Sequence, residues 1–135
     1  MKGVIDASFV ASLILPDEQS ERSEATMRSL STDGIAVPAL WQLEVTNLLL
    51  MAERRKRISA AIVRKLSDAI DGLPVTIEPP LTVEQRGDVL NLARTHQLTA
   101  YDSAYLELTL RLGGPLATLD AALRKAAVSC GVTVW

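Results

Sequence analysis

Short runs of apolar, often β-branched residues alternate along the chain with longer segments of helical periodicity. Five runs are candidate strands: KGVI (2–5), GIAV (34–37), VTI (75–77), PLATL (115–119) and VTVW (132–135). Helical spacing marks seven segments, which are Ala7–Leu15, Ser20–Leu30, Ala39–Arg55, Ser59–Ile70, Val83–His96, Asp102–Leu112 and Ala121–Ser129. Short apolar strands separated by helices are typical of a parallel sheet that helices cover on both faces. The sequence therefore predicts an α/β fold with a parallel sheet of about five strands.

The size of the chain fits one ordinary domain. Its 135 residues are 48% hydrophobic, enough for a sizeable core, and no repeat, low-complexity tract or linker divides residues 1–135. With one cysteine, Cys130, and one histidine, His96, the chain offers no Cys/His cluster for zinc and no internal disulfide. The first residues lack the pattern of a signal peptide, and no apolar run approaches the length of a membrane span. We expect a single cytoplasmic domain that has no membrane segment.

Three aspartates stand where the predicted strands and helices meet. Asp6 directly follows GVI, Asp120 directly follows PLATL, and Asp102 opens the predicted helix that leads to PLATL. In open parallel sheets, sites form outside the carboxyl ends of the strands, and a right-handed crossover helix starts at that same rim. The three carboxylates can therefore converge. The alternative is that they are three unrelated helix caps, a role in which aspartate is common.

Glu44 does not fit the capping explanation. It is the only ionisable residue in ALWQLEVTNLLLMA (39–52), and helical spacing places it on a face with Leu40, Asn47 and Leu48. Either this face touches solvent and Glu44 is an ordinary surface residue, or the carboxylate is buried and needs a compensating charge. No lysine or arginine within the segment could provide that charge.

A divalent cation would compensate four converging carboxylates. Two carboxylates about 4 Å apart repel each other by roughly 4 kcal/mol at an effective dielectric constant near 20. All-oxygen coordination selects hard ions such as Mg²⁺ or Mn²⁺, which activate water for phosphodiester hydrolysis. The net charge of −2 does not exclude RNA, because removing four of the 16 acidic residues leaves 12 against 14 lysines and arginines.

Four motifs carry a family resemblance that spans the chain. VIDAS (4–8), PALWQLEVTNLL (38–49), LTAYDSAYL (98–106) and LATLDAALRKAA (116–127) resemble the acidic motifs of PIN-domain ribonucleases, and more narrowly those of VapC-type toxins of bacterial toxin–antitoxin pairs. The resemblance implies a metal site, which would be both catalytic and Mg²⁺- or Mn²⁺-binding, formed by Asp6, Glu44, Asp102 and Asp120. It also implies endonucleolytic cleavage of RNA, a homodimer, and a VapB-type antitoxin whose C-terminal segment occupies the active-site groove.

Three polar residues match positions beside the metal site in that family. Ser8 and Thr118 match hydroxyl positions, and Asn47 matches the polar residue one helical turn after the glutamate. Their alternative role is that of ordinary polar residues at helix starts or on a helix surface. Leu119 stands where some relatives carry a polar residue, which makes Asp120 the weakest of the four expected ligands.

Other charged residues are expected outside the site. The basic cluster ERRKR (53–57) could contact RNA phosphates, although cations at a helix C-terminus are also expected from the helix dipole. His96 reads as a surface residue, and Glu107 falls on a different helix face from Asp102. The apolar segment VTNLLLMA (45–52) exceeds what one sheet face needs, so we expect a second subunit to bury part of it.

Other functions fit the sequence less well. A receiver domain would carry paired acids after the first strand, and a haloacid-dehalogenase-type phosphatase would carry Asp-x-Asp there, whereas the chain has IDASF (5–9). The remaining alternative is a non-catalytic PIN-fold module that binds RNA or a protein partner. The presence of all four acids favours the nuclease.

Overall fold

Seven helices and four short strands alternate along the chain in the computed structural model, which describes residues 1–135. In chain order they are β1 (Gly3–Ile5), α1 (Ala7–Ile14), α2 (Glu21–Ser31), β2 (Ile35–Val37), α3 (Trp41–Arg54), α4 (Ala60–Asp71), β3 (Val75–Ile77), α5 (Val83–His96), α6 (Ala100–Leu112), β4 (Leu116–Ala117) and α7 (Ala121–Ser129). No helix is both long enough and apolar enough to span a membrane.

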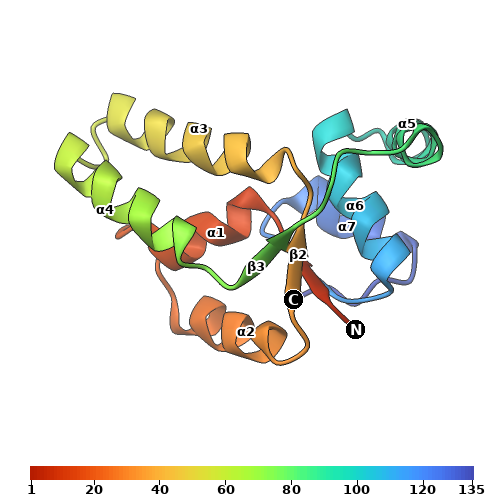
Figure 1. Ribbon diagram of the computed structural model, residues 1–135, viewed down its shortest axis with the longest axis horizontal. Coiled ribbons are helices and arrows are strands. Elements are labelled where there is room, and N and C mark those ends of the chain that lie inside the picture. The colour runs from red at the N-terminus through yellow and green to blue at the C-terminus, as the bar shows by residue number, and fades with distance from the viewer.

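The strands form one parallel sheet in the order β3-β2-β1-β4. Val4 on β1 is paired with Ala36 on one side and with Leu116 on the other. In Figure 1, α3 lies above the sheet, α1 and α4 to its left and α2 below it, whereas α5 to α7 lie to its right. The predicted α/β fold with helices on both sides of a parallel sheet is confirmed.

The sheet has four strands rather than about five, because VTVW (132–135) does not form a full strand. This segment makes one bridge, between Val134 and Leu116, supported by hydrogen bonds from Leu116 N to Thr133 O and from Trp135 N to Leu116 O at 2.9 Å each. β4 is itself only two residues long, so it offers a fifth strand too little backbone to pair with.

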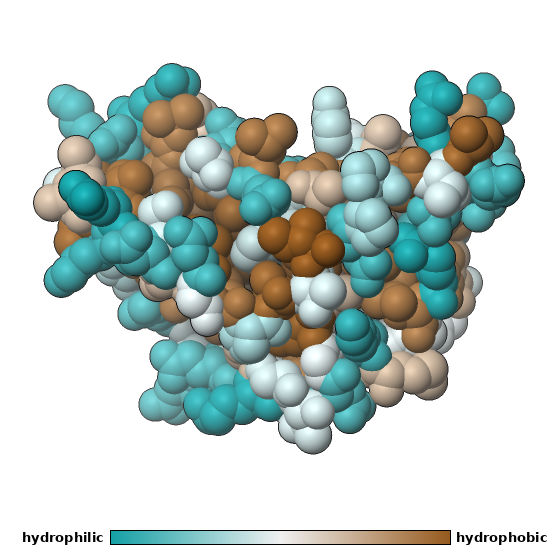
Figure 2. Space-filling view, in the orientation of Figure 1, coloured by the Kyte–Doolittle hydropathy of each residue, from teal (hydrophilic) through white to brown (hydrophobic).

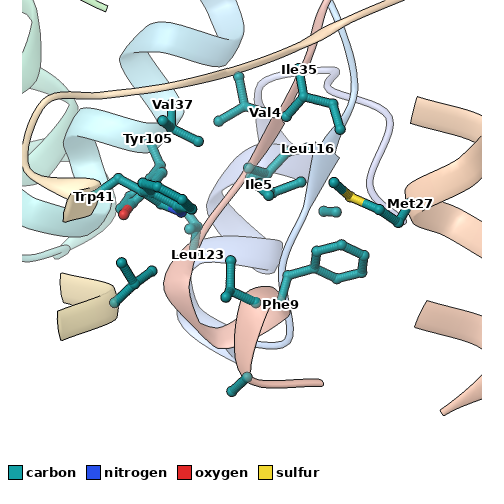
Figure 3. Packing of buried hydrophobic residues seen from close by; sticks show 14 of the residues in the cluster. Val4, Ile5, Phe9, Met27, Ile35, Val37, Trp41, Tyr105, Leu116 and Leu123 are labelled. Carbon is teal, nitrogen blue, oxygen red and sulfur yellow. The ribbon is translucent and has the colours of Figure 1, made fainter. Parts of the chain in front are cut away.

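The core is built around β1, β2 and β4, whose residues are all buried. In Figure 3, Ile5 and Leu116 lie between Trp41 and Tyr105 on one side and Met27 and Phe9 on the other. Strands that are buried on both faces explain why the runs in the sequence are continuously apolar instead of alternating. A close approach of backbones permits the β1–β4 pairing: a Cβ on Gly114 would lie 1.7 Å from the carbonyl oxygen of Lys2.

The carboxyl ends of β1 and β4 meet at the point where the chain connections diverge. β1 leads through α1 and α2 to β2 on one side, whereas the chain enters β4 on the other side from α6. Asp6 N donates to Ala117 O at 3.2 Å, which joins the two strand ends. Ligand sites in open α/β sheets form at such switch points. Figure 2 shows the upper outline of the molecule dipping between the lobe of α3 and α4 and the lobe of α5.

Candidate active site

Asp6 is the most firmly held of the four acids. It follows β1 directly and caps α1, because its Oδ1 accepts from Phe9 N at 2.9 Å. The same oxygen accepts from Ser8 Oγ at 2.6 Å, and Thr118 Oγ1 donates to the other oxygen, Oδ2. The side chain is buried. Three donors therefore fix a buried carboxylate at the rim of the sheet.

Asp120 belongs to the same hydrogen-bonded network. It caps α7, its Oδ2 accepting from Leu123 N at 2.8 Å, and its own N donates to Thr118 Oγ1 at 3.0 Å. Leu119 N donates to Ser8 Oγ at 2.9 Å. The hydroxyls of Ser8 and Thr118 thus connect the start of α1 to the start of α7, and each contacts Asp6.

Glu44 reaches the site from the first turn of α3, where it is half-buried beside the buried stripe formed by Trp41, Val45 and Leu49. Its Oε1 accepts from the Tyr105 hydroxyl at 2.6 Å. Tyr105 is 1% exposed and belongs to α6. A buried donor on one helix therefore orients the carboxylate of another.

Asp102 is not a helix cap. α6 begins at Ala100, earlier than the sequence predicted, and Thr99 caps it by accepting from Asp102 N at 3.1 Å. Asp102 sits in the first turn, half-buried, where the helix dipole favours a negative charge. Of the three aspartates, Asp6 and Asp120 are caps, whereas capping cannot account for Asp102.

The negative charges of three of the acids act on the fourth, Asp102. Burial, followed by repulsion from Asp120, Glu44 and Asp6, raises the pKa of Asp102 to about 6. Burial also raises the pKa of Glu44 and of Asp6, and the charges of Asp6 and Asp120 respectively add to these increases. Burial and the bond to Glu44 raise the pKa of the Tyr105 hydroxyl, so it stays a protonated donor. Like charges held together in a partly buried site favour binding of a cation.

The donor set fits a hard divalent ion, although the side chains are not drawn together around one. No three acidic, histidine or cysteine side chains lie close enough to form a metal cluster by themselves. The site offers carboxylate oxygens and contains no cation among the groups that shift its pKa values. Mg²⁺ takes only one or two protein carboxylates and retains several waters, so widely spaced acids are compatible with it.

The other residues singled out in the sequence lie around this site or away from it. Asn47 is exposed on α3, one turn after Glu44, with no side-chain hydrogen bond. Within the basic cluster, Arg57 is bound to Asp17 Oδ1 at 2.8 Å and to Glu18 Oε2 at 2.6 Å, which leaves Arg54, Arg55 and Lys56 exposed.

Two residues set aside in the sequence have structural partners. Glu107 is buried and paired with Arg111, Nε to Oε1 at 2.8 Å. His96 is partly buried, and its Nε2 lies 3.4 Å from Cys130 Sγ. His96 is therefore not the free surface residue that the sequence suggested.

Sequence reasoning missed two contributors, Tyr105 and Arg124. Arg124 donates from Nη2 to Thr118 O at 3.0 Å, behind the hydroxyl that contacts Asp6. Their positions in the sequence could have indicated both residues. Each lies three or four residues after a site aspartate, a spacing that places side chains on the same helix face.

Comparison with known proteins agrees with the fold and the motifs. The model of the PIN domain family matches residues 3–129. Ribonuclease VapC3 of Pyrobaculum aerophilum is 32% identical over 126 residues, which cover 91% of this chain and 92% of that protein.

Two solved structures share the fold. The crystal structure of PAE2754 from Pyrobaculum aerophilum has a TM-score of 0.71 at 24% identity, and the alignment covers 99% of this chain and 83% of that one. The crystal structure of FitAcB from Neisseria gonorrhoeae has a TM-score of 0.69 at 15% identity, covering 98% of this chain and 96% of that one. With the family model matching nearly the whole chain, the resemblance seen in the four acidic motifs is confirmed: the chain belongs to the PIN domain family.

Proposed function

We propose that this protein is a metal-dependent endoribonuclease, the toxin of a toxin–antitoxin pair. The observation that carries the proposal is the electrostatic environment of Asp102, whose pKa is raised to about 6 by burial and then by the charges of the three other acids. The relative named Ribonuclease VapC3 supports RNA as the substrate. The VapC resemblance also supports a VapB-type antitoxin and a homodimer as partners.

Asp6, Glu44, Asp102 and Asp120 would hold Mg²⁺ or Mn²⁺. When bound, such an ion acidifies a water and offsets charge on the leaving oxygen of a phosphodiester. The protein itself holds the carboxylate oxygens of these acids in fixed positions. Ser8, Phe9 N and Thr118 immobilise Asp6, and Tyr105 leaves Glu44 Oε2 as the oxygen free to face the ion.

The decisive experiment is RNA cleavage by the purified protein with EDTA, followed by Mg²⁺ or Mn²⁺ add-back. We expect EDTA to abolish cleavage and either metal to restore it, with new ends inside the RNA. Asp102→Asn, purified in parallel, controls for contaminating nucleases and should be inactive. Cleavage that persists in EDTA, or that Asp102→Asn retains, would contradict the proposal.

A non-catalytic PIN module that binds RNA or protein is the alternative function. The same assay separates the two, because such a module would bind without cutting under every metal condition. The raised pKa of Asp102, caused by burial and then by the repulsion of three carboxylates, favours the nuclease, because this arrangement costs stability that a binding surface has no need to sacrifice.

A further inference from the structure

A cavity of about 400 Å³ adjoins the acidic site between α1, the first half of α2 and the start of α7. Figure 1 shows α2 below α1. The cavity's lining includes Leu119 and Arg124, which lie on either side of Asp120 in the chain. Leu119 N donates to Ser8 Oγ and Arg124 to Thr118 O, so one wall is made of the segment that also holds Asp6.

Two arginines give this cavity a positive character. Arg22, on the first turn of α2, is exposed and has no ion-pair partner. Arg124 is half-buried, and its Nη2 donates to Thr118 O at 3.0 Å and to the carboxylate oxygen of the last residue, Trp135 O, at 3.1 Å. The one acid in the lining, Glu18, is bound to Arg57 at 2.6 Å. An arginine without an ion-pair partner, Arg22, next to a cluster of carboxylates suits an anion that must be held near those carboxylates.

The rest of the lining suits a nucleobase and its ribose. Trp135 is 40% exposed and offers an indole face, on which a base of any kind can stack. Ser20 is exposed and contributes a hydroxyl, whose 2.9 Å hydrogen bond to Ser23 Oγ can exchange for a contact to ribose or a base edge. The volume lies within the range typical of small-ligand pockets.

From the cations, the aromatic face and the shared wall, we infer that this cavity, named here the Arg22–Trp135 pocket, binds one nucleotide of a single-stranded RNA beside the scissile bond. The base stacks on Trp135, and Arg22 and Arg124 contact the adjoining phosphate. The inference rests on the proposed function for its substrate class. It adds which surface of this chain holds the RNA next to the acids.

The test measures RNA binding in EDTA, where cleavage does not occur. The fluorescence anisotropy of labelled single-stranded oligo(U) and oligo(A) reports the binding. Trp135→Ala should weaken binding by about fivefold to a hundredfold, the cost of losing one stacked base. Arg22→Ala should weaken it and reduce the salt slope by about 0.7, the value for one phosphate contact on a single strand. Arg28→Ala, an exposed arginine on the same helix outside the cavity, is the matched control and should bind as the wild type does.

Tryptophan fluorescence gives a second readout that does not depend on a labelled RNA. Trp41 is buried, so quenching by adenosine 5′-monophosphate should come from Trp135 and should be absent in Trp135→Phe when Trp41 alone remains. Ribose 5-phosphate, which has no base, should quench much less.

The outcomes separate the two proposals. If the wild type cuts RNA but Arg22→Ala and Trp135→Ala bind it unchanged, the pocket inference is overturned while the nuclease stands. A wild type that does not bind RNA overturns the pocket inference as well. If RNA binds through these residues but is never cut with added metal, the pocket stands and the proposed nuclease fails.

Discussion

The Tyr105 hydroxyl on α6 donates to Glu44 Oε1 on α3 at 2.6 Å, across 61 positions in the sequence. The bond fixes the orientation of the one site carboxylate that comes from α3. It also occupies one of the two oxygens, so Glu44 has a single oxygen to offer a metal ion. Tyr105 is thus a positioning residue for the site.

Replacing Tyr105 with phenylalanine removes this donor and keeps the buried ring. We expect Tyr105→Phe to fold, to lose about 1–2 kcal/mol of unfolding free energy, and to bind Mn²⁺ about 10- to 100-fold more weakly, as is usual when a group that orients a metal ligand is removed. Calorimetric titration with Mn²⁺ measures the affinity directly. Tyr101→Phe, on the exposed face of the same helix, is the control, and a Tyr105→Phe variant with unchanged affinity would show that the bond is only structural.

Variants of Thr99 and Asp102, which lie within one turn of α6, separate capping of the helix from metal binding and cleavage. Thr99→Ala removes the cap and should cost about 1 kcal/mol of unfolding free energy, while reducing cleavage far less than Asp102→Asn does. Asp102→Asn should leave the metal-free fold intact and abolish cleavage, because a neutral amide is a poor ligand for a hard cation. Chemical denaturation and the RNA assay on both variants check the pair, and an active Asp102→Asn would remove Asp102 from the site.

The raised pKa of Asp102 makes the stability of the metal-free protein depend on pH. Between about pH 4 and pH 6 the folded state keeps a proton that the unfolded state releases, so stability falls as the pH rises through this window and levels off above it. The raised pKa values of Asp6 and Glu44 act in the same direction.

Melting temperatures in EDTA should therefore be higher near pH 5 than near pH 7, with a smaller difference in Asp102→Asn. With Mn²⁺ the trend should reverse, because the ion competes with protons for the carboxylates and stabilises the native state by mass action. A metal-free melting temperature that increased from pH 5 to pH 7 would contradict the electrostatic description of the site.

The sequence carries enough information to predict most of the architecture and the edge of the sheet at which Asp6 and Asp120 lie. Continuous apolar runs indicate buried parallel strands, and Asp6 and Asp120 follow two of them directly, so their meeting requires only that β1 and β4 be neighbours, as they are. The strand count was less predictable, because VTVW has the composition of a strand, yet the two-residue β4 can pair with it at only one position.

Details that depend on contacts between helices were beyond the sequence. The sequence indicates that Tyr105 is a core aromatic residue within an apolar helix, and its hydroxyl reaches Glu44 only because the fold brings the first turn of α3 close to Tyr105. The position of Asp102 was misread for a local reason: Thr99 and Asp102 are both good capping residues, and the structure gives the cap to the first of them.

Association of two subunits is expected through α3. Leu43 is 76% exposed and Leu50 37% exposed on this helix, and Figure 2 shows apolar side chains at the surface in the region of α3 and α4. We predict a dimer at micromolar concentration in light scattering, and a shift toward monomer in Leu50→Glu. Leu90→Glu, at a leucine on α5 that is 52% exposed, should leave the mass unchanged. A wild-type monomer would leave these leucines to be covered by a different partner.

Asp120 combines both roles, and three variants can separate them. Its Oδ2 accepts from Leu123 N at 2.8 Å, and it follows Leu119, which stands where some relatives carry a polar residue, so we expect its contribution to binding to be the smallest of the four acids. Asp120→Asn keeps the cap and should lose less Mn²⁺ affinity and less cleavage than Asp6→Asn or Glu44→Gln. Asp120→Ala also removes the cap and should lose about 1 kcal/mol of unfolding free energy beyond the asparagine variant. Asp120→Asn should also bring the pKa of Asp102 closer to its ordinary value, because among the neighbouring charges that of Asp120 raises this pKa most. The pH-dependence of the melting temperature in EDTA should then be weaker. An Asp120→Asn protein with the wild-type pH-dependence and wild-type Mn²⁺ affinity would reduce Asp120 to a cap for α7 and the site to three acids.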